Sequence, residues 1–370
     1  MRKSKRKHIT YRSTGVNYDL VDPFKILMQK QAKKTSRNVM QLGYKEISQS
    51  RGETAYVIEA NDHHVALIQE GLGSKNLVAD KMYLIEGRSY YHQIAQDAVA
   101  TIINDLIAVG AKPLALNAYW ATHSYDWFKH KTRAEDLIKG WRQACDIAKV
   151  SWGGGETQSL PDIIKQGCIE LAGSAIGIIK PKERLTLGDK LTPDDAILLV
   201  ESSGIHANGL TLARTIASNL PEGYSTPLSD GTLFGESLLT PTHIYVQLIQ
   251  DLFEQDIDIH YMVNITGHGW RKLMRANRDF TYVIDEIPEP QPVFKFIQEQ
   301  SGNDDREMYG NFNMGAGFAV FVPQAHVYNV QKIGREHLLS ILNAGVVKGG
   351  QRQVIIKPRN KLVFNELGVR

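Results

Sequence analysis

The sequence contains two cysteines in 370 residues, Cys145 and Cys168. Neither has a second cysteine or a histidine at the spacing that metal-binding motifs use. Free cysteine commonly behaves as a small, buried packing residue. We therefore expect both thiols to be reduced and partly buried, and to take no part in metal binding.

Long apolar runs are also missing. No uninterrupted apolar segment approaches the roughly 18–20 residues that cross a bilayer, and no apolar signal core follows the basic residues Met1–Lys7. We therefore expect a cytoplasmic protein with no membrane partner. The net charge is +3, and we interpret residues 1–10 as a disordered basic tail rather than a nucleic-acid-binding arm.

Several catalytic signatures are absent as well. The glycine turns carry no Ser–His–Asp order, no Cys–His pair, no His-Glu-x-x-His helix and no Rossmann Gly-x-Gly-x-x-Gly. This argues against a covalent nucleophile and against hydride transfer. The chemistry that remains is phosphate handling, with carboxylates to hold Mg²⁺ and backbone amides to hold oxyanions.

What the sequence does contain is ordinary globular composition, with 42% apolar and 22% charged residues. A chain of this length favours two domains. The charged, turn-rich segment Pro181–Asp195 is the best boundary, so we predict domains over residues 11–180 and 181–370. Both halves follow a strand, glycine turn and helix plan, which predicts an α/β fold. Within it we expect a strand pair at Ala55–Glu59 and His64–Ile68, a loop over Ser36–Gly52, and one helix over Ser237–Asp251.

The first glycine turn, Gln69–Lys75, follows the apolar run His64–Ile68. Glycines let backbone N–H groups approach an anion without a Cβ in the way. The segment adds a carboxylate, a hydroxyl and an amine to two glycines, in the order Glu70, Gly71, Gly73, Ser74 and Lys75. That combination suits a triphosphate held through a divalent cation. The alternative is a strand that ends in a glycine turn with solvated charges.

The second half of Gly87–Gly110 predicts a helix that is apolar on most sides. At 100° per residue, Asp97 and Asn104 lie within about 20° of each other, and Asp105 lies about 80° from Asp97. A carboxylate on such a helix is costly unless it meets a cation or hydrogen-bond donors. Contact with a ligand or metal and a solvated helix face remain alternatives.

Two further glycine turns carry polar side chains. Gly154 and Gly155 precede Glu156 after a short strand, where bare backbone suits close approach of a ligand. The second turn, Glu201–Gly209, contains His206 and Asn208 and leads into a helix. Its first-turn N–H groups lack partners, which makes an anion-binding geometry.

These motifs, in this order, resemble the aminoimidazole ribonucleotide synthetase (phosphoribosylformylglycinamidine cyclo-ligase) family over roughly Tyr11–Pro323. The matching segments are dispersed through both halves: Tyr11 with Gly15–Val16, Lys33–Thr35, Glu70–Lys75, Asn104–Leu106, Gly110–Pro113, Gly154–Thr157, Ser202–Gly209, Leu239–Thr242, Ile244–Val246, Ile265–Gly267, Glu307–Tyr309 and Phe312–Gly315. The resemblance implies a two-domain α/β (α+β) chain. Its N-terminal domain would dimerise through a shared β-barrel, and its C-terminal domain would be a mixed sheet with helices.

The resemblance also implies the reaction. ATP phosphorylates the formyl amide oxygen of formylglycinamidine ribonucleotide, and the internal nitrogen then closes the imidazole and expels phosphate. The partners implied are this small-molecule nucleotide and a second copy of the chain. A related ATP-dependent kinase or synthetase on another nucleotide-like substrate, and a non-catalytic nucleotide-binding paralogue, are the alternative interpretations.

Carried over position by position, the family's site residues form three groups. Glu70, Asp97 and Asp105 would hold Mg²⁺ and the ATP phosphates. The nucleotide would be bound by a larger set: Lys33, Lys34, Gly71, Gly73, Ser74, Lys75, Asn104, Gly154, Gly155 and Asn208. We expect Lys75, Glu156 and His206 to be catalytic, with either Glu156 or His206 as a general base.

This chain also departs from the family pattern. Glu70 stands where the family has Asp, and Ala118 and Ser159 stand where Asp and Glu are usual. His268 replaces a glycine, and Gly310–Asn311 replaces Arg-Thr. Several of these positions are expected in or near the site, so they suggest a divergent branch, a different but related substrate, or a paralogue with reduced activity.

Overall fold

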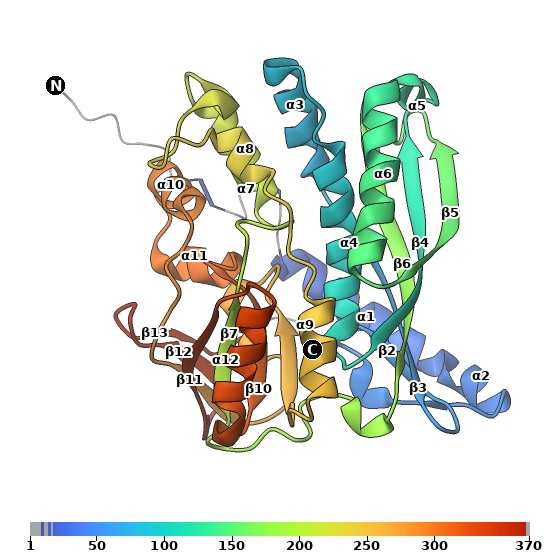
Figure 1. The fold of residues 1–370 in the computed structure, drawn as a ribbon, viewed down its shortest axis with the longest axis vertical. Helices are drawn as coiled ribbons and strands as arrows, with labels where there is room; N and C mark the ends of the chain where they lie inside the picture. Colours follow the sequence, from blue (N-terminus) through green and yellow to red (C-terminus); the bar gives the residue numbers. More distant parts are fainter. Residues whose placement is uncertain (1–8, 11–13, 16–17, 368–370) are drawn as a thin grey trace.

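The computed structural model describes residues 9–10, 14–15 and 18–367 of the chain. Most of the expected basic tail, residues 1–8, lies outside these ranges, while the Ile9 amide donates to the Ser301 carbonyl oxygen at 3.1 Å. Two β-sheets stand side by side with helices between and around them (Figure 1). The chain is therefore an α/β protein of two sheet-centred halves.

The helices and strands of the N-terminal half are α1 (Tyr18–Ala32), α2 (Ser36–Gln41), β1 (Lys45–Glu46), β2 (Tyr56–Glu59), β3 (His64–Gly71), α3 (Asn76–Glu86), α4 (Tyr91–Ile107), β4 (Lys112–Thr122), α5 (Asp126–Lys129), α6 (Lys131–Ile147), β5 (Ser151–Ser159) and β6 (Ile169–Ile179). Those of the C-terminal half are β7 (Ala196–Glu201), α7 (Leu210–Asn219), α8 (Phe234–Leu238), α9 (Val246–Glu254), β8 (Tyr261–Asn264), β9 (Phe280–Ile284), α10 (Pro292–Ser301), α11 (Asp305–Asn311), β10 (Ala316–Val322), α12 (Val327–Glu336), β11 (Ile341–Gly349), β12 (Gln353–Ile356) and β13 (Leu362–Phe364). Short 3-10 helices include η2 (Lys33–Thr35), η3 (Ser48–Ser50) and η6 (Gly269–Met274).

The N-terminal sheet has the order β1-β2-β3-β6-β4-β5. In β3 the even-numbered residues His64, Ala66 and Ile68 are buried while Leu67 is exposed, because successive side chains of a strand point to opposite faces. The buried face packs against α4. The opposite face, which we call the open face, carries Leu67 and its cross-strand neighbour Ile176.

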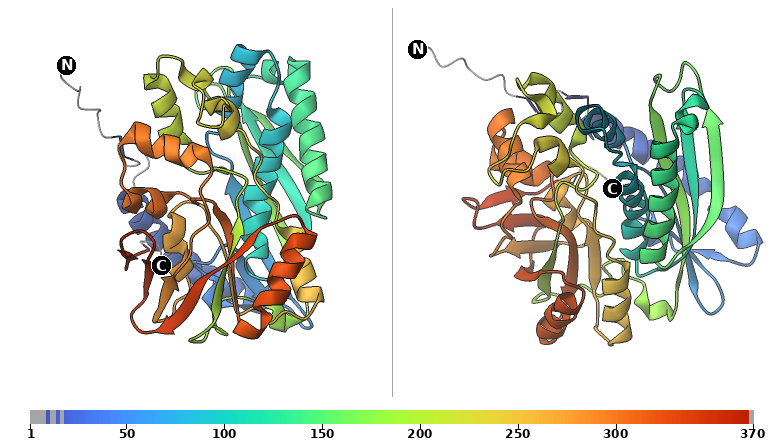
Figure 2. Two further views of the ribbon diagram at one scale, coloured as in Figure 1. Left: turned by 60° about the vertical axis from the view of Figure 1, so that its left-hand side comes forward. Right: turned by 45° about the horizontal axis from the view of Figure 1, so that its top comes forward.

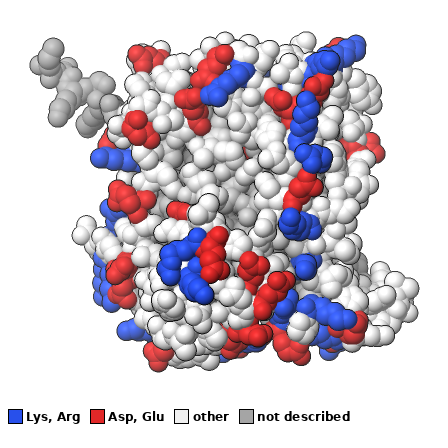
Figure 3. Space-filling model, in the orientation of Figure 1, with Lys and Arg blue, Asp and Glu red and all other residues white. Residues whose placement is uncertain are grey.

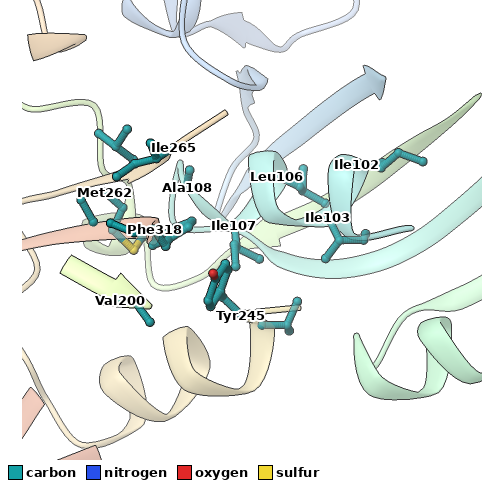
Figure 4. Close-up of a cluster of buried hydrophobic side chains, with 14 of the residues drawn as sticks. Ile102, Ile103, Leu106, Ile107, Ala108, Val200, Tyr245, Met262, Ile265 and Phe318 are labelled. Carbon is teal, nitrogen blue, oxygen red and sulfur yellow. The ribbon is translucent and has the colours of Figure 1, made fainter. Parts of the chain in front are cut away.

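Helix α4 lies between the two sheets, as both views in Figure 2 show. It is apolar on most of its surface, and such a helix is stable only when it is buried on most sides. Figure 4 shows its side chains meeting residues of the C-terminal half, with Ile107 close to Tyr245 and Phe318. One continuous apolar core therefore joins the two halves.

The C-terminal sheet has the order β13-β12-β9-β11-β7-β10-β8. All seven residues of β10 are buried, as are the first five of β7. A strand covered on both faces has an almost uninterrupted apolar sequence, and both strands do. The loops that follow β7 and β8 return toward α4, and this places their glycine turns at the junction of the two halves.

Several sequence predictions need correction. The expected loop Ser36–Gly52 contains α2, β1 and η3, and the expected helix Ser237–Asp251 is interrupted between α8 and α9. Pro241 lies in that interruption and has no N–H to donate to a helix. The Thr240 carbonyl oxygen, in the same interruption, accepts a hydrogen bond from Lys75 Nζ. The strand pair at β2 and β3 is confirmed.

None of the helices in residues 9–10, 14–15 and 18–367 is long and apolar enough to cross a membrane.

Candidate active site

A cavity of about 370 Å³ opens where β3 and α4 meet the loops after β7 and β8. We call it the junction cavity. It brings together five of the residues that the sequence singled out: Glu70, Gly71, Gly73, Asp105 and Asn208. Residues from both halves of the chain therefore share one site.

Two carboxylates face this cavity from the N-terminal half. Glu70 is the penultimate residue of β3 and continues the register of the buried, α4-facing positions, while Asp105 is near the C-terminal end of α4. Asp105 Oδ1 accepts a hydrogen bond of 2.7 Å from Asn264 Nδ2. Burial, followed by the nearby Asp105 carboxylate, raises the pKa of Glu70. Two crowded carboxylates, Asp105 buried and Glu70 half-buried, favour a bound cation, and oxygen donors of this kind suit Mg²⁺.

A buried lysine that the sequence analysis did not identify faces them from the C-terminal half. Lys272 on η6 is 8% exposed, and its Nζ donates to the Asn264 carbonyl oxygen at 3.3 Å and to Thr266 Oγ1. Burial lowers the pKa of Lys272 to about 8, although Asp105 attracts the charged form. Lys272 directly follows Arg271, shortly after the turn Thr266–Gly269, and this basic pair was the signal available in the sequence.

The glycine turn after β3 has the conformation that the sequence suggested. Gly73 has φ +76°, a left-handed backbone with open space where a Cβ would lie, and glycine adopts it without strain. Gly71 and Gly73 line the junction cavity, but Ser74 and Lys75 do not. The bare backbone of the turn is thus available to an anion in the cavity.

Lys75 and Asp97 form an ion pair that is fully buried. Lys75 Nζ lies 2.8 Å from Asp97 Oδ1 and 2.8 Å from the Thr240 carbonyl oxygen. The backbone N–H and hydroxyl of Thr242 also donate to Asp97 Oδ1, at 2.9 and 2.5 Å. Both side chains have zero exposure. In this structure they bind the segment between α8 and α9, and they do not face the junction cavity.

The side chain of Asn104 also bonds to the backbone of the segment between α8 and α9. Its Nδ2 donates to the His243 carbonyl oxygen at 2.8 Å, and its Oδ1 accepts from the Tyr245 N–H at 3.1 Å. Gln96 Nε2 donates to the Thr242 carbonyl oxygen at 2.9 Å. The polar stripe of α4 that the helical spacing revealed therefore holds residues 240–245, and we call these contacts the α4 seam.

Glu156 lies on the other face of the N-terminal sheet. The sequence placed Gly154, Gly155 and Glu156 in a turn, but all three belong to the edge strand β5. The strand register aligns Glu156 with Gly71 through β4 and β6, so the two are three strand spacings apart, about 14 Å. Glu156 shares the open face with Gly71, whereas Glu70 points to the α4 side.

Of the two predicted residues in the turn after β7, Asn208 lines the junction cavity and His206 does not, because His206 is buried. His206 is 3% exposed, and its Nε2 accepts a hydrogen bond from the Ser203 N–H at 3.2 Å. Burial lowers the pKa of His206 well below its usual value, so the ring is neutral. In this structure its contacts position the turn between β7 and α7 and do not place it in the cavity.

Lys33 and Lys34 are exposed on η2, and Lys34 Nζ bonds to Gln31 Oε1 at 2.9 Å. Neither lines the junction cavity, whereas Lys25 of α1 does.

Among the positions that depart from the family pattern, His268 lines the junction cavity with φ +69°, and its Nε2 lies 3.5 Å from Asp22 Oδ2. Ala118 is buried in β4, and Ser159 Oγ donates to the His123 carbonyl oxygen.

Across the described part of the chain, no three His, Cys, Asp or Glu side chains gather as a metal cluster would require. A pair of carboxylates is nevertheless a common protein contribution to Mg²⁺, because the ion usually keeps several waters and binds substrate phosphates directly. The donor set of the junction cavity therefore fits a metal–nucleotide complex better than a bare structural ion.

Comparison with known families covers both halves. Residues 52–179 match the family described as "AIR synthase related protein, N-terminal domain", and residues 192–357 match "AIR synthase related protein, C-terminal domain". A phosphoribosylformylglycinamidine cyclo-ligase of Methanothermobacter thermautotrophicus is 37% identical over 85% of this chain and 88% of its own. One from Methanosarcina barkeri is 32% identical over 92% and 97%.

Solved structures show the same fold at lower identity. Thiamine-monophosphate kinase from Stenotrophomonas maltophilia K279a has a TM-score of 0.56 at 19% identity, covering 82% of this chain and 88% of that one. Hydrogenase maturation protein HypE in complex with ATP has a TM-score of 0.56 at 19% identity, covering 79% and 81%. Identities this low support the architecture alone.

Proposed function

The chain belongs to the AIR synthase related protein family, and we propose that it is an ATP-dependent ligase that closes formylglycinamidine ribonucleotide to aminoimidazole ribonucleotide in purine biosynthesis. The observation that carries this proposal is the junction cavity, where Glu70 and Asp105 face the buried ammonium of Lys272. Phosphoryl transfer depends mainly on positioning and charge neutralisation, and these three groups supply both.

The reaction has two chemical stages. The γ-phosphoryl group of ATP passes to the formyl amide oxygen, which leaves ADP and converts that oxygen into a leaving group. The internal nitrogen then attacks the same carbon, the imidazole ring closes, and phosphate departs with the oxygen. No covalent enzyme intermediate is needed, in agreement with a site that offers charge and backbone amides.

We assign the phosphate end of ATP to the junction cavity. Mg²⁺, held by Glu70 and Asp105, would neutralise charge on the phosphate oxygens. Gly71 and Gly73 present bare backbone to those oxygens, and Lys272 balances the negative charge that remains. Asn208 lines the C-terminal wall of the cavity and would contact the substrate there. Asp97 and Lys75 have no part in this assignment, because their contacts in the α4 seam bury them completely.

A second copy of the chain would give a role to the predicted residues on and near the open face. Gly154, Gly155 and Glu156 of the edge strand β5, of which Glu156 is on the open face, and Lys33 and Lys34 on η2 lie outside the junction cavity of their own protomer. We propose that two chains pair through their open faces to form a shared barrel, and that these residues act at the resulting interface. The apolar cross-strand pair Leu67 and Ile176, 39% and 40% exposed, supports such pairing.

The test is product formation from ATP and formylglycinamidine ribonucleotide. We expect ADP and aminoimidazole ribonucleotide in equal amounts, with the second product measured by a colour reaction for aminoimidazole. ADP release without ring closure would assign the chain to a different reaction of the same superfamily, and binding of ATP without turnover would contradict an enzymatic role.

Asp105→Asn tests the metal assignment. This change keeps the size of the side chain and removes its charge, so we expect Mg²⁺-dependent ATP binding to weaken by at least about tenfold. Isothermal titration with ATP, with and without Mg²⁺, measures the effect. Asp146→Asn is the matched control, because Asp146 is exposed in a surface pair with Arg142 on α6. Equal Mg²⁺-dependent binding by Asp105→Asn and wild type would disprove the assignment.

A further inference from the structure

A second cavity, of about 910 Å³, opens beside the junction cavity. The two cavities share Lys25, Glu53, Glu70 and Arg275 in their walls. The second one also contains a group of arginines, so we call it the arginine compartment. Its basic side chains are Lys25, Arg51, Arg275, Arg278 and Arg352, against the carboxylates Glu53, Glu70 and Asp189. The compartment thus has an excess of positive charge, continuous with the candidate active site.

Two of these arginines are fixed by main-chain carbonyl groups. Arg352 Nε donates to the Met274 carbonyl oxygen at 2.8 Å, at the C-terminal end of η6. Arg275 donates from Nε and Nη2 to the Gly52 carbonyl oxygen, at 3.1 and 3.0 Å, and its Nε lies 3.5 Å from Glu53 Oε2. A carbonyl partner orients a guanidinium group without cancelling its charge. Arg352 is therefore oriented in advance and still cationic.

The other arginines differ in their partners. Arg51 forms two short bonds to the Glu46 carboxylate, 2.9 and 2.6 Å, so its charge is compensated. Arg278 is exposed, and its guanidinium carbon lies 5.3 Å from the centre of the Phe280 ring. The described contact of Arg278 is thus an aromatic ring, and those of Arg352 are carbonyl groups. Both arginines bring positive charge to the compartment.

This arrangement differs from the ordinary charged surface of the chain. On α6, basic and acidic side chains alternate in pairs such as Lys139 with Glu135 and Arg142 with Asp146. Figure 3 shows mixed blue and red side chains on the face that includes this helix. Such pairs neutralise each other in water and are weak. The arginine compartment instead gathers five basic side chains against three carboxylates in a concave site, and this excess of positive charge attracts an anion.

We propose that the arginine compartment binds the phosphomonoester of the substrate while the reacting end of that substrate lies in the junction cavity. Guanidinium groups suit a phosphate because their N–H donors match two of its oxygens at once. The shared wall at Glu70 and Arg275 allows one molecule to span both cavities. The inference rests on the proposed function, in which the substrate carries a ribose 5-phosphate.

Ribose 5-phosphate is the probe, because its binding requires neither ATP nor turnover. We expect Arg278→Gln and Arg352→Gln each to weaken its binding about 10- to 100-fold in isothermal titration, as the loss of a charge-assisted contact predicts. Both variants should raise the KM for the ribonucleotide substrate to a similar extent and leave the affinity for ATP unchanged. Arg142→Gln, on α6, is the control and should match the wild type in all three measurements.

The outcomes separate this inference from the proposed function. Product formation with an unchanged KM and unchanged ribose 5-phosphate binding in both variants would overturn the inference alone. Loss of ribose 5-phosphate binding in a chain that forms no aminoimidazole would support the compartment and overturn the proposed reaction. Weaker ATP binding in place of weaker ribose 5-phosphate binding would show that the arginines contact the nucleotide, and would overturn the inference. Arg278→Gln leaves the bonds at η6 intact, so it tests the compartment even if Arg352→Gln unfolds.

Discussion

At the scale of single residues, His206 shows how burial determines what a titratable group does. Its ring lies beside His243 and Tyr245 and accepts a bond from the Ser203 N–H. Burial, with His243 and Lys75 nearby, holds its pKa well below 6.5. The residue therefore stays neutral when the same histidine in the unfolded chain is protonated.

This gives a prediction for stability in acid. Below about pH 6.5 the unfolded chain binds a proton at His206 that the folded chain does not, so stability is lost as the pH falls. One such group contributes a slope of up to about 1.4 kcal/mol per pH unit. Urea unfolding between pH 7.5 and 5.5 should therefore show a smaller pH slope for His206→Gln than for the wild type. An identical slope would show that His206 is not a source of the pH dependence.

The sequence motifs predicted only some of the residues that line the junction cavity. Glu70, Gly71, Gly73, Asp105 and Asn208 meet there as the motifs suggested. Lys272 was missed because a lysine beside an arginine in a short mixed segment has no distinctive spacing, and only the tertiary fold shows what it faces. Asp97 and Lys75 carry charges as suitable as those of Asp105, and sequence alone does not distinguish a buried ion pair from a ligand contact.

At the scale of elements, α4 binds the two halves together. Its apolar surface belongs to the common core, and the α4 seam places Gln96, Asp97 and Asn104 against residues 240–245. Helical spacing predicted that the polar side chains share one side of α4. It did not predict their partner, because that segment was assigned to a helix and a helix would have used its own backbone groups internally.

Asp97→Asn tests the seam. The change leaves the ammonium of Lys75 buried without its counter-charge, and removing one member of a buried pair typically costs about 3–5 kcal/mol. We expect the free energy of unfolding in urea to fall by that amount. Asp146→Asn, which removes an exposed pair on α6, should cost less than about 1 kcal/mol. Similar losses in the two variants would mean that Lys75 finds another partner when Asp97 is neutral.

The elements that sequence predicted well are those with strong periodic patterns: β2, β3 and α4. The N-terminal segment failed because α2 and β1 are short and polar. Gly153–Thr157 failed for a different reason. Glycine usually weakens a strand, but a Cβ on Gly155 would lie 1.9 Å from the Ala118 carbonyl oxygen, so close strand pairing requires glycine there.

At the scale of the whole molecule, the open face of the N-terminal sheet remains to be covered. A cavity of about 830 Å³ separates part of it from α1, η2 and α2. The face carries the aligned pair Leu67 and Ile176, and apolar side chains in register on a sheet are well placed to pair with a second sheet. The proposed dimer supplies that sheet.

Leu67→Glu tests the dimer. A charge on the open face must be desolvated when two sheets meet, so we expect this variant to sediment as a monomer where the wild type sediments as a dimer. It should also lose activity if Glu156 acts across the interface. Leu338→Glu is the control, since Leu338 is 90% exposed in the loop after α12. Dimers of both variants, or a monomeric wild type, would contradict the proposed pairing.

The α4 seam also limits how relatives of this chain can be recombined. A chimera joined in the linker between the two halves would bring α4 from one parent against residues 240–245 from another. The Lys75–Asp97–Thr242 contacts are buried, so a mismatch there leaves a charge or a polar group without a partner inside the core. Functional chimeras must therefore inherit Lys75, α4 and residues 240–245 from a single parent, even though these segments lie in different halves of the sequence.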